Sequence, residues 1–152
     1  CGAGDYARLA AARGASAVTA VDRSAAMAAQ VPPPVEAVVA DAARVRLGRR
    51  FDIVLALGLL EFVDDPAAVT ANAAAHLATG GRLIVLVPPD NLAGHLYRLF
   101  HNGHGLAVRL FSPPSVEEMA RSCGLTVSGR RMVAPYSAVY AMEPGCPRAC
   151  CS

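Results

Sequence analysis

The sequence contains no lysine and no tryptophan, and aromatic residues make up only 5% of its 152 positions. All fourteen basic residues are arginines, scattered from Arg8 to Arg148, and the formal net charge is only +2. Because the arginines form no run or stripe, we expect no nucleic-acid partner. The longest apolar runs, such as 53–60 and 83–87, fall short of the roughly 20 residues that cross a bilayer, and no charged-then-apolar leader opens the chain. We therefore expect a cytoplasmic protein without a membrane span.

The cysteines are few and badly placed for a disulfide framework, because their number, five, is odd and three of them lie in the last seven residues. Cys146, Cys150 and Cys151 could supply thiolates to zinc, but no further paired cysteine or histidine cluster completes a four-ligand site. We expect no metal centre. The proline, glycine and serine content of residues 144–152 predicts a disordered tail after a core at 1–143.

Hydrophobic residues make up 54% of the chain and charged residues 17%, which is enough apolar material for one compact domain. Four apolar runs, at 17–21, 35–40, 51–57 and 82–87, are continuous rather than alternating, as strands covered on both faces are. Alanine-rich segments that favour helix lie between them, at 5–13, 24–30 and 66–78. This alternation predicts an α/β fold with parallel strands joined by crossover helices.

The regular alternation of predicted strands and helices changes after Pro88-Pro89. Residues 92–100 predict a further helix, and a glycine-containing loop follows at 102–105. Ser112-Pro113 predicts a helix start, and Ser115 with Glu118 has the spacing of a capping box.

The helix that starts at Ser112-Pro113 is expected to stop at Gly124, where two more strands begin, at 125–133 and 137–142. Only a short Pro135-Tyr136 turn separates these strands. So short a link permits an antiparallel hairpin but not a parallel crossover.

Three segments carry residues suited to holding an adenosine. Gly2 and Gly4 stand before a helix, where side-chain-free backbone can approach a ligand, although this spacing also fits the dinucleotide fingerprint. Asp22 ends the following strand, where a carboxylate can accept hydrogen bonds from both hydroxyls of a ribose; its alternative role is a helix cap. Asp41 ends the next strand and suits the exocyclic amine of adenine; its alternative role is a turn residue.

In this order the motifs resemble the class I S-adenosylmethionine-dependent methyltransferases over about residues 1–142. The resemblance implies a Rossmann-like three-layer sandwich with strand order 3-2-1-4-5-7-6, an antiparallel seventh strand, and S-adenosylmethionine as cofactor. It implies cofactor-binding roles for Gly2, Gly4, Asp22, Arg23, Asp41, Ala42 and Leu57. The matching segments are Cys1-Gly2-Ala3-Gly4, Val21-Asp22-Arg23-Ser24, Asp41-Ala42, Phe51-Asp52-Ile53-Val54 with Leu60-Glu61-Phe62-Val63, Leu77-Ala78-Thr79-Gly80-Gly81-Arg82-Leu83, and Phe111-Ser112-Pro113 with Ser122-Cys123-Gly124-Leu125.

The sequence departs from the family at two places. The family has an apolar strand carrying an acid, and one more glycine, before the position of Cys1. We therefore expect a chain truncated before its first strand that keeps the layered fold but binds the cofactor poorly. Many relatives have histidine at the position of Phe62, so no catalytic base is assigned there.

The methyl acceptor and the catalytic residues are not fixed by these motifs. His95, His101, His104 and Tyr97 are candidate bases, each with a solvated or packing role as the alternative. Leucines at 92, 96, 99 and 106 suggest a pocket wall for a small organic or lipid-like acceptor, or else plain core. Two other functions stay open: an NAD(P)-dependent oxidoreductase, and a non-catalytic module that binds an adenosine cofactor.

Overall fold

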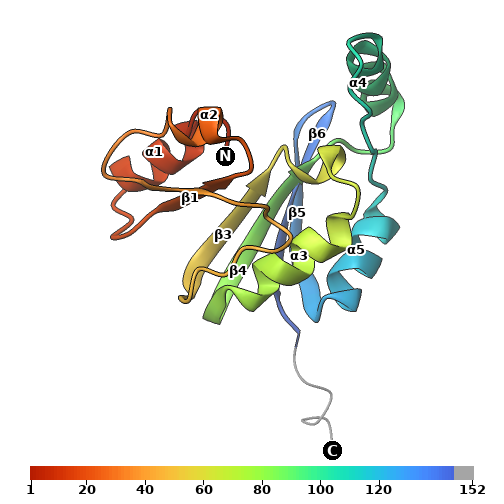
Figure 1. Ribbon diagram of the computed structural model, residues 1–152. Helices are drawn as coiled ribbons and strands as arrows, with labels where there is room; N and C mark the ends of the chain where they lie inside the picture. Colours follow the sequence, from red (N-terminus) through yellow and green to blue (C-terminus); the bar gives the residue numbers. More distant parts are fainter. Residues whose placement is uncertain (146–152) are drawn as a thin grey trace, which may run out of the picture. The chain divides into compact units, whose positions relative to one another are not determined.

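The computed structural model describes residues 1–145 of the chain (Figure 1). The chain divides into two compact units, Cys1–Arg46 and Leu47–Ser152, and each is described by itself. The predicted tail falls almost wholly outside the described residues, and so do Cys146, Cys150 and Cys151. Pro144, the first residue of that predicted tail, is the last residue of a strand.

The first unit contains two helices and two strands: α1 (Asp5–Ala12), β1 (Thr19–Asp22), α2 (Ala25–Ala28) and β2 (Glu36–Val39). β1 and β2 pair in parallel, with Asp22 opposite Val39. Ser24 caps α2, because its hydroxyl accepts a hydrogen bond from the Met27 N–H at 3.3 Å. Capping by Ser24 leaves the neighbouring Asp22 carboxylate available for other partners.

The second unit contains a four-stranded sheet in the order β3-β4-β6-β5. β3 and β4 are parallel, whereas β6 runs antiparallel to both of its neighbours. The short link between β5 and β6 produces this arrangement, as predicted for an antiparallel hairpin. The four strands are β3 (Phe51–Leu57), β4 (Leu77–Val87), β5 (Leu125–Ala134) and β6 (Ser137–Pro144).

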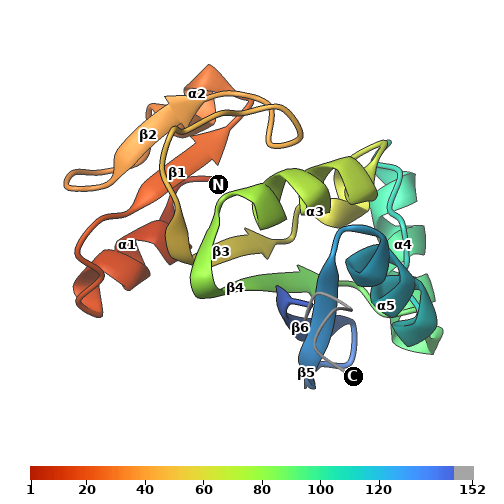
Figure 2. The same cartoon turned by 90° about the horizontal axis from the view of Figure 1, so that it is seen from below.

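Helices α3 (Pro66–Ala75) and α5 (Pro113–Ser122) pack against each other and against β4 and β5 (Figure 2). Asp65 caps α3 and Ser112 caps α5, each by accepting a backbone N–H, and proline occupies the first turn of both helices. Fully buried side chains fill the core of this unit. They are Leu83, Val85 and Val87 of β4, Val116 and Ala120 of α5, and Ala138 and Met142 of β6.

The remaining elements lie around the carboxyl ends of β3 and β4. The 3₁₀ turn η1 (Leu60–Phe62) follows β3, and α4 (Leu92–Gly103) follows β4. Figure 1 shows α4 projecting beyond the sheet. Asn91 caps α4 by accepting the Gly94 N–H at 2.8 Å.

The strand and helix pattern predicted from the sequence is confirmed as a Rossmann-like α/β fold with a C-terminal antiparallel hairpin. The implied order 3-2-1-4-5-7-6 appears without its strand 1: the pair β2-β1 of the first unit corresponds to 3-2, and β3-β4-β6-β5 of the second corresponds to 4-5-7-6. Across residues 1–145, no helix combines the length and hydrophobicity that a membrane span requires.

Three local predictions are wrong. Helix α3 stops at Ala75 rather than at 78, because Leu77 already pairs with Phe51 as the first residue of β4. The cap of α5 is Ser112, since its side chain accepts the Ser115 N–H, and Glu118 pairs instead with Arg121. The predicted loop at 102–105 belongs partly to α4, which continues to Gly103.

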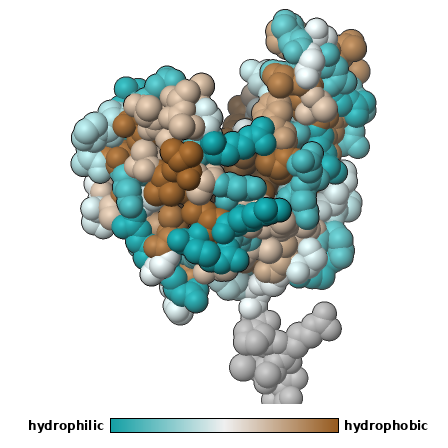
Figure 3. Space-filling view, viewed as in Figure 1, coloured by the Kyte–Doolittle hydropathy of each residue, from teal (hydrophilic) through white to brown (hydrophobic). Residues whose placement is uncertain are grey.

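The leucines at 92, 96, 99 and 106 are neither core nor the wall of an enclosed pocket. Their exposed fractions lie between 49% and 78%, and Phe100 beside them is 64% exposed. The space-filling view shows apolar side chains among polar ones on the surface of α4 (Figure 3). Helical spacing alone could not separate this exposed stripe from a buried one.

Candidate functional site

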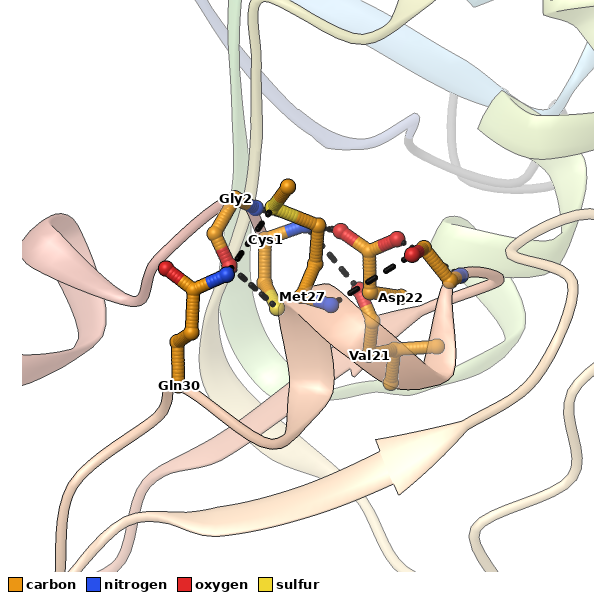
Figure 4. Close-up of polar contacts among 7 residues, drawn as sticks. Cys1, Gly2, Val21, Asp22, Met27 and Gln30 are labelled. Atoms are coloured by element: carbon orange, nitrogen blue, oxygen red, sulfur yellow. Dashed lines mark hydrogen bonds and ion pairs between the residues drawn. The ribbon is translucent and has the colours of Figure 1, made fainter.

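The chain's first turn brings Gly2 and Asp22 together at the carboxyl end of β1 (Figure 4). The Gly2 N–H donates to Asp22 Oδ2 at 3.1 Å, and the amino nitrogen of Cys1 lies 2.6 Å from the same oxygen. The Ser24 N–H donates to Asp22 Oδ1 at 2.9 Å. Nitrogen donors from the glycine loop and from the start of α2 therefore converge on one carboxylate.

These donors also set the charge of Asp22. Burial raises the pKa of its carboxyl, but the Cys1 amino group and the backbone N–H groups of Ser24 and Gly2 more than offset this, so the pKa falls below its ordinary value. The side chain stays 16% exposed, and each carboxylate oxygen can accept more than one hydrogen bond. Asp22 is thus held as an anion with acceptor capacity to spare.

Gly2 and Gly4 both have backbone conformations that favour glycine, with φ of 54° and 82°, but their surroundings differ. A Cβ at Gly2 would meet no atom within 4 Å, whereas a Cβ at Gly4 would lie 3.1 Å from Val31 Cγ2. Gly2 therefore leaves open space beside Asp22. Gly4 is needed for close packing and for the turn into α1.

Asp41 lies just beyond β2, the parallel neighbour of β1, so the carboxyl ends of the two strands bring Asp22 and Asp41 to one sheet edge. Asp41 is exposed, and its Oδ1 accepts the Ala43 N–H at 2.8 Å. This contact is the turn-forming role that was its alternative. Ala42 beside it is half-buried, and Arg23 is exposed.

Leu57 lies in the second unit, as the last residue of β3, and is half-buried. The structure thus brings Gly2 and Asp22 into direct contact and places Asp41 and Ala42 at the same edge of the β1-β2 sheet. Leu57 ends a strand of the other sheet.

The sequence-based interpretation missed Glu61, which lies in η1 directly after β3. This side chain is only 4% exposed, and among residues 1–145 its Oε2 has no hydrogen-bond partner. Desolvation raises the pKa of Glu61 to about 7. A hydrogen bond from the residue's own backbone N–H lowers this pKa, but by less than desolvation raises it. The signal available in the sequence was a single carboxylate within an otherwise apolar segment after an apolar strand.

Aromatic rings gather beside Glu61, and we call Phe62, Tyr97, His101 and Tyr136 the ring cluster. The rings of Tyr97 and His101 lie 4.3 Å apart between centroids, and Tyr97 stacks on Tyr136 at 5.9 Å. Phe62 meets His101 edge-on at 6.2 Å. Burial, followed by the negative charge of Glu61, raises the pKa of the Tyr97 phenol, so this member of the cluster lies within electrostatic range of the carboxyl.

The other two candidate bases, His95 on α4 and His104 just after it, already contact other groups of this segment. His95 Nε2 lies 2.9 Å from Asp90 Oδ1, and its Nδ1 lies 3.0 Å from Arg98. His104 follows the helix, where its Nδ1 contacts the Phe100 carbonyl at 2.8 Å. Of the four predicted candidates, only Tyr97 and His101 belong to the ring cluster.

No three histidine, cysteine, aspartate or glutamate side chains within residues 1–145 lie close enough together to hold a metal ion. Cys1 and Cys123 are free thiols, and Cys123 Sγ contacts the Ala67 carbonyl at 3.4 Å.

Comparison with known proteins agrees with this geometry. Residues 1–128 match the model of the family described as "Methyltransferase domain". The ubiquinone biosynthesis O-methyltransferase of Nitrosomonas europaea is 30% identical over 163 residues, a match that covers 94% of this chain and 69% of that protein.

Solved structures show the same fold. Magnesium protoporphyrin IX methyltransferase from Synechocystis PCC 6803, crystallised with S-adenosylhomocysteine, matches with a TM-score of 0.75 at 18% identity, over 93% of this chain and 69% of that chain. The CcbJ methyltransferase from Streptomyces caelestis matches with a TM-score of 0.75 at 20% identity, over 95% and 86%. The family match and the curated relative together show that the chain belongs to the class I S-adenosylmethionine-dependent methyltransferases.

Proposed function

We propose that this chain binds S-adenosylmethionine and transfers its methyl group to an oxygen atom of a small organic or lipid-like acceptor. The observation that carries the proposal is the convergence of the Gly2 and Ser24 N–H groups on Asp22 at a strand end, in a chain whose family is shown. The relative that is 30% identical is an O-methyltransferase, which supports oxygen as the acceptor atom.

The residues present fit the adenosine part of this cofactor. Asp22 is an anion whose Oδ1 accepts one hydrogen bond and can accept one more, which suits a ribose hydroxyl, and the absent side chain of Gly2 leaves room beside it. Asp41 and Ala42 lie at the neighbouring strand end and are our candidates for the adenine. Gly4, Arg23 and Leu57 complete the proposed set, with Gly4 acting through loop shape.

When bound, the cofactor supplies a methyl group that its sulfonium has already activated, so the protein's main contribution is alignment and water exclusion. The acceptor must reach that methyl group near the carboxyl ends of the strands. The exposed leucines of α4 offer an apolar surface near the ends of β3 and β4, which favours an acceptor with apolar character.

Calorimetric titration with S-adenosylhomocysteine and, separately, with NAD(H) tests the cofactor. We expect binding of the first ligand only; binding of NAD(H) alone would replace the proposal with an oxidoreductase. Transfer of a labelled methyl group to hydroxylated small molecules, compared with amine and thiol analogues, tests the acceptor atom. Labelling of amines or thiols without hydroxyl products would contradict the proposed acceptor.

A further inference from the structure

Glu61 is an ionisable residue of the second unit that is almost fully buried. The residue is only 4% exposed, and within residues 1–145 its buried Oε2 accepts no hydrogen bond. A buried polar atom without a partner costs roughly 1–3 kcal/mol, and more when it is charged. Such a cost at a strand end, where α/β sheets bind ligands, points to a partner that arrives with the substrate.

The backbone next to Glu61 needs glycine for its conformation. Gly58 has a φ of 63°, and a Cβ at that position would be in ordinary contact with Glu61 Oε1, at 3.8 Å. The left-handed conformation of Gly58 forms the turn from β3 into η1, and its position lies beside the Glu61 carboxyl. The Glu61 carbonyl accepts the Arg109 N–H at 3.0 Å, which fixes the backbone but gives Oε2 of the side chain no partner.

No positive charge offsets the burial of Glu61 within residues 1–145. The Arg109 guanidinium donates to the Asp64 carbonyl at 3.2 Å and is exposed. The negative charge of Glu61 acts on the Tyr97 phenol of α4, whose ring lies against His101 and stacks on Tyr136 from the turn between β5 and β6. A planar molecule with one hydroxyl matches both the carboxyl and the rings linked to Tyr97.

A ligand can reach Glu61 Oε2 only if a neighbouring segment moves, because this oxygen is buried. Figure 1 shows α4, which carries Tyr97 and His101, projecting past the sheet. Elements with few buried contacts open at low free energy, so α4 is the neighbouring element that we expect to move.

We propose that Glu61 is the catalytic residue that accepts the proton of a hydroxyl on a planar aromatic acceptor, which stacks against the ring cluster. This inference rests on the proposed function. The acceptor oxygen forms a bond to the methyl carbon as the carbon–sulfur bond breaks, the electron pair of that bond stays on sulfur as a thioether, and the hydroxyl proton passes to Glu61 Oε2. The carboxyl's raised pKa suits it to take a proton near neutral pH.

The test compares the parent chain with Glu61→Gln, which keeps the side chain's shape but removes the ionisable carboxyl. Glu118→Gln on the exposed face of α5 is the matched control. Naphthol is the probe, and methoxynaphthalene, which lacks the hydroxyl, is its control. Binding of each is followed by fluorescence between pH 6 and 8 with S-adenosylhomocysteine present, and calorimetry measures S-adenosylhomocysteine binding separately. Thermal unfolding checks that each variant is folded.

We expect naphthol affinity in the parent and in Glu118→Gln to rise by about tenfold from pH 6 to 8, as a charge-assisted hydrogen bond forms. Methoxynaphthalene affinity should not change with pH. Glu61→Gln should lose the rise while binding S-adenosylhomocysteine as the parent does. Naphthol binding that is absent, independent of pH in the parent, or unchanged in Glu61→Gln overturns the assignment of Glu61. Failure of S-adenosylhomocysteine to bind any of the three proteins overturns the proposed function instead.

Discussion

Asp22 is held by three nitrogen donors, and this has a consequence for its replacement. Removing the carboxylate leaves the Gly2 and Ser24 N–H groups without an acceptor, but both lie at or near the surface, where water can replace it. The effect on folding should therefore be small compared with the effect on a ligand that uses the same carboxylate.

Asp22→Ala should weaken S-adenosylhomocysteine binding by roughly 1.5–3 kcal/mol, the usual worth of hydrogen bonds to a charged group, with little change in stability. Calorimetry and thermal unfolding measure the two effects. Asp5→Ala is the control, since Asp5 pairs only locally with Arg8 on α1. Equal affinity in Asp22→Ala and the parent would remove Asp22 from the site.

Replacing Asp41 separates a ligand-binding role from a structural one, because its Oδ1 already accepts a hydrogen bond within a turn. Asp41→Asn keeps the side-chain oxygen that accepts the Ala43 N–H, so the turn should survive. Loss of the negative charge should still lower affinity for S-adenosylhomocysteine if the residue contacts the adenine amine. Calorimetry decides the matter: unchanged affinity together with lower stability would leave Asp41 as a turn former.

Glu61 should make stability depend on pH. Its pKa is 4.5 in an unfolded chain and about 7 in the fold, so folding favours the protonated form. Stability from this residue is fully present below pH 4.5 and is lost as the pH rises to about 7, by at most about 3 kcal/mol. Denaturant unfolding should show that the free energy of unfolding of Glu61→Gln rises relative to that of the parent between pH 4.5 and about 7. A difference between the two proteins that stays constant with pH would contradict the raised pKa.

At the level of single residues, the sequence predicted that Asp22 and the glycine loop share one sheet edge, because a strand end and a glycine turn about twenty positions apart imply proximity in a parallel fold. It did not predict the hydrogen bond from Gly2 to Asp22. Nor did it predict Glu61. A lone glutamate after a strand is typical of the surface, and the burial of Glu61 depends on tertiary packing that no local pattern reports. It also could not tell that His95 and His104 lie on the outer surface of α4.

The start of α4 depends on Gly94, the only described glycine of the chain at which a Cβ would come within 2.5 Å of another atom. That atom is the Pro89 carbonyl oxygen, 1.9 Å away. Because the blocking atom is backbone, the first turn of the helix must shift to admit any side chain. Gly103, at the other end of α4, has no atom within 4 Å of its Cβ position.

Gly94→Ala should destabilise the protein by about 1–3 kcal/mol and move the ring cluster with α4, which weakens naphthol binding. Gly103→Ala should be neutral or stabilising by up to about 1 kcal/mol, since alanine favours helix. Thermal unfolding and the fluorescence titration measure both variants. Equal stability of the two variants would show that the start of α4 adapts without cost.

Element types were predicted well because each has its own local signal: continuous apolar runs for strands, alanine-rich segments for helices, and a two-residue turn for the hairpin. Boundaries were less secure where neighbouring elements compete. Leu77 fits the apolar spacing of α3, yet its pairing with Phe51 places it in β4. Long-range strand pairing decided that boundary, and no local pattern reports it.

The two units of the chain differ in how much core they contain. The first unit buries only Ala20, Ala28 and Val35 among its apolar residues, and no residue of α1 is fully buried. The second unit buries whole rows of valine, leucine, methionine and tyrosine on β4 and β6. A two-stranded sheet with so small a core is only marginally stable, so local opening should concentrate there.

Amide hydrogen exchange should therefore separate the two sheets. We expect the amides of β1 and β2 to exchange at least about tenfold faster than those of β4 and β6, because opening of the first unit exposes little apolar surface. Adding S-adenosylhomocysteine should slow exchange at Gly2 and between Asp22 and Ser24, since a ligand that binds only the closed form stabilises it by mass action. The amides of β5 and β6 serve as the internal control and should change little. Uniform exchange in both sheets would mean that the chain opens as one cooperative body, and protection confined to β5 and β6 would place the ligand away from the glycine turn.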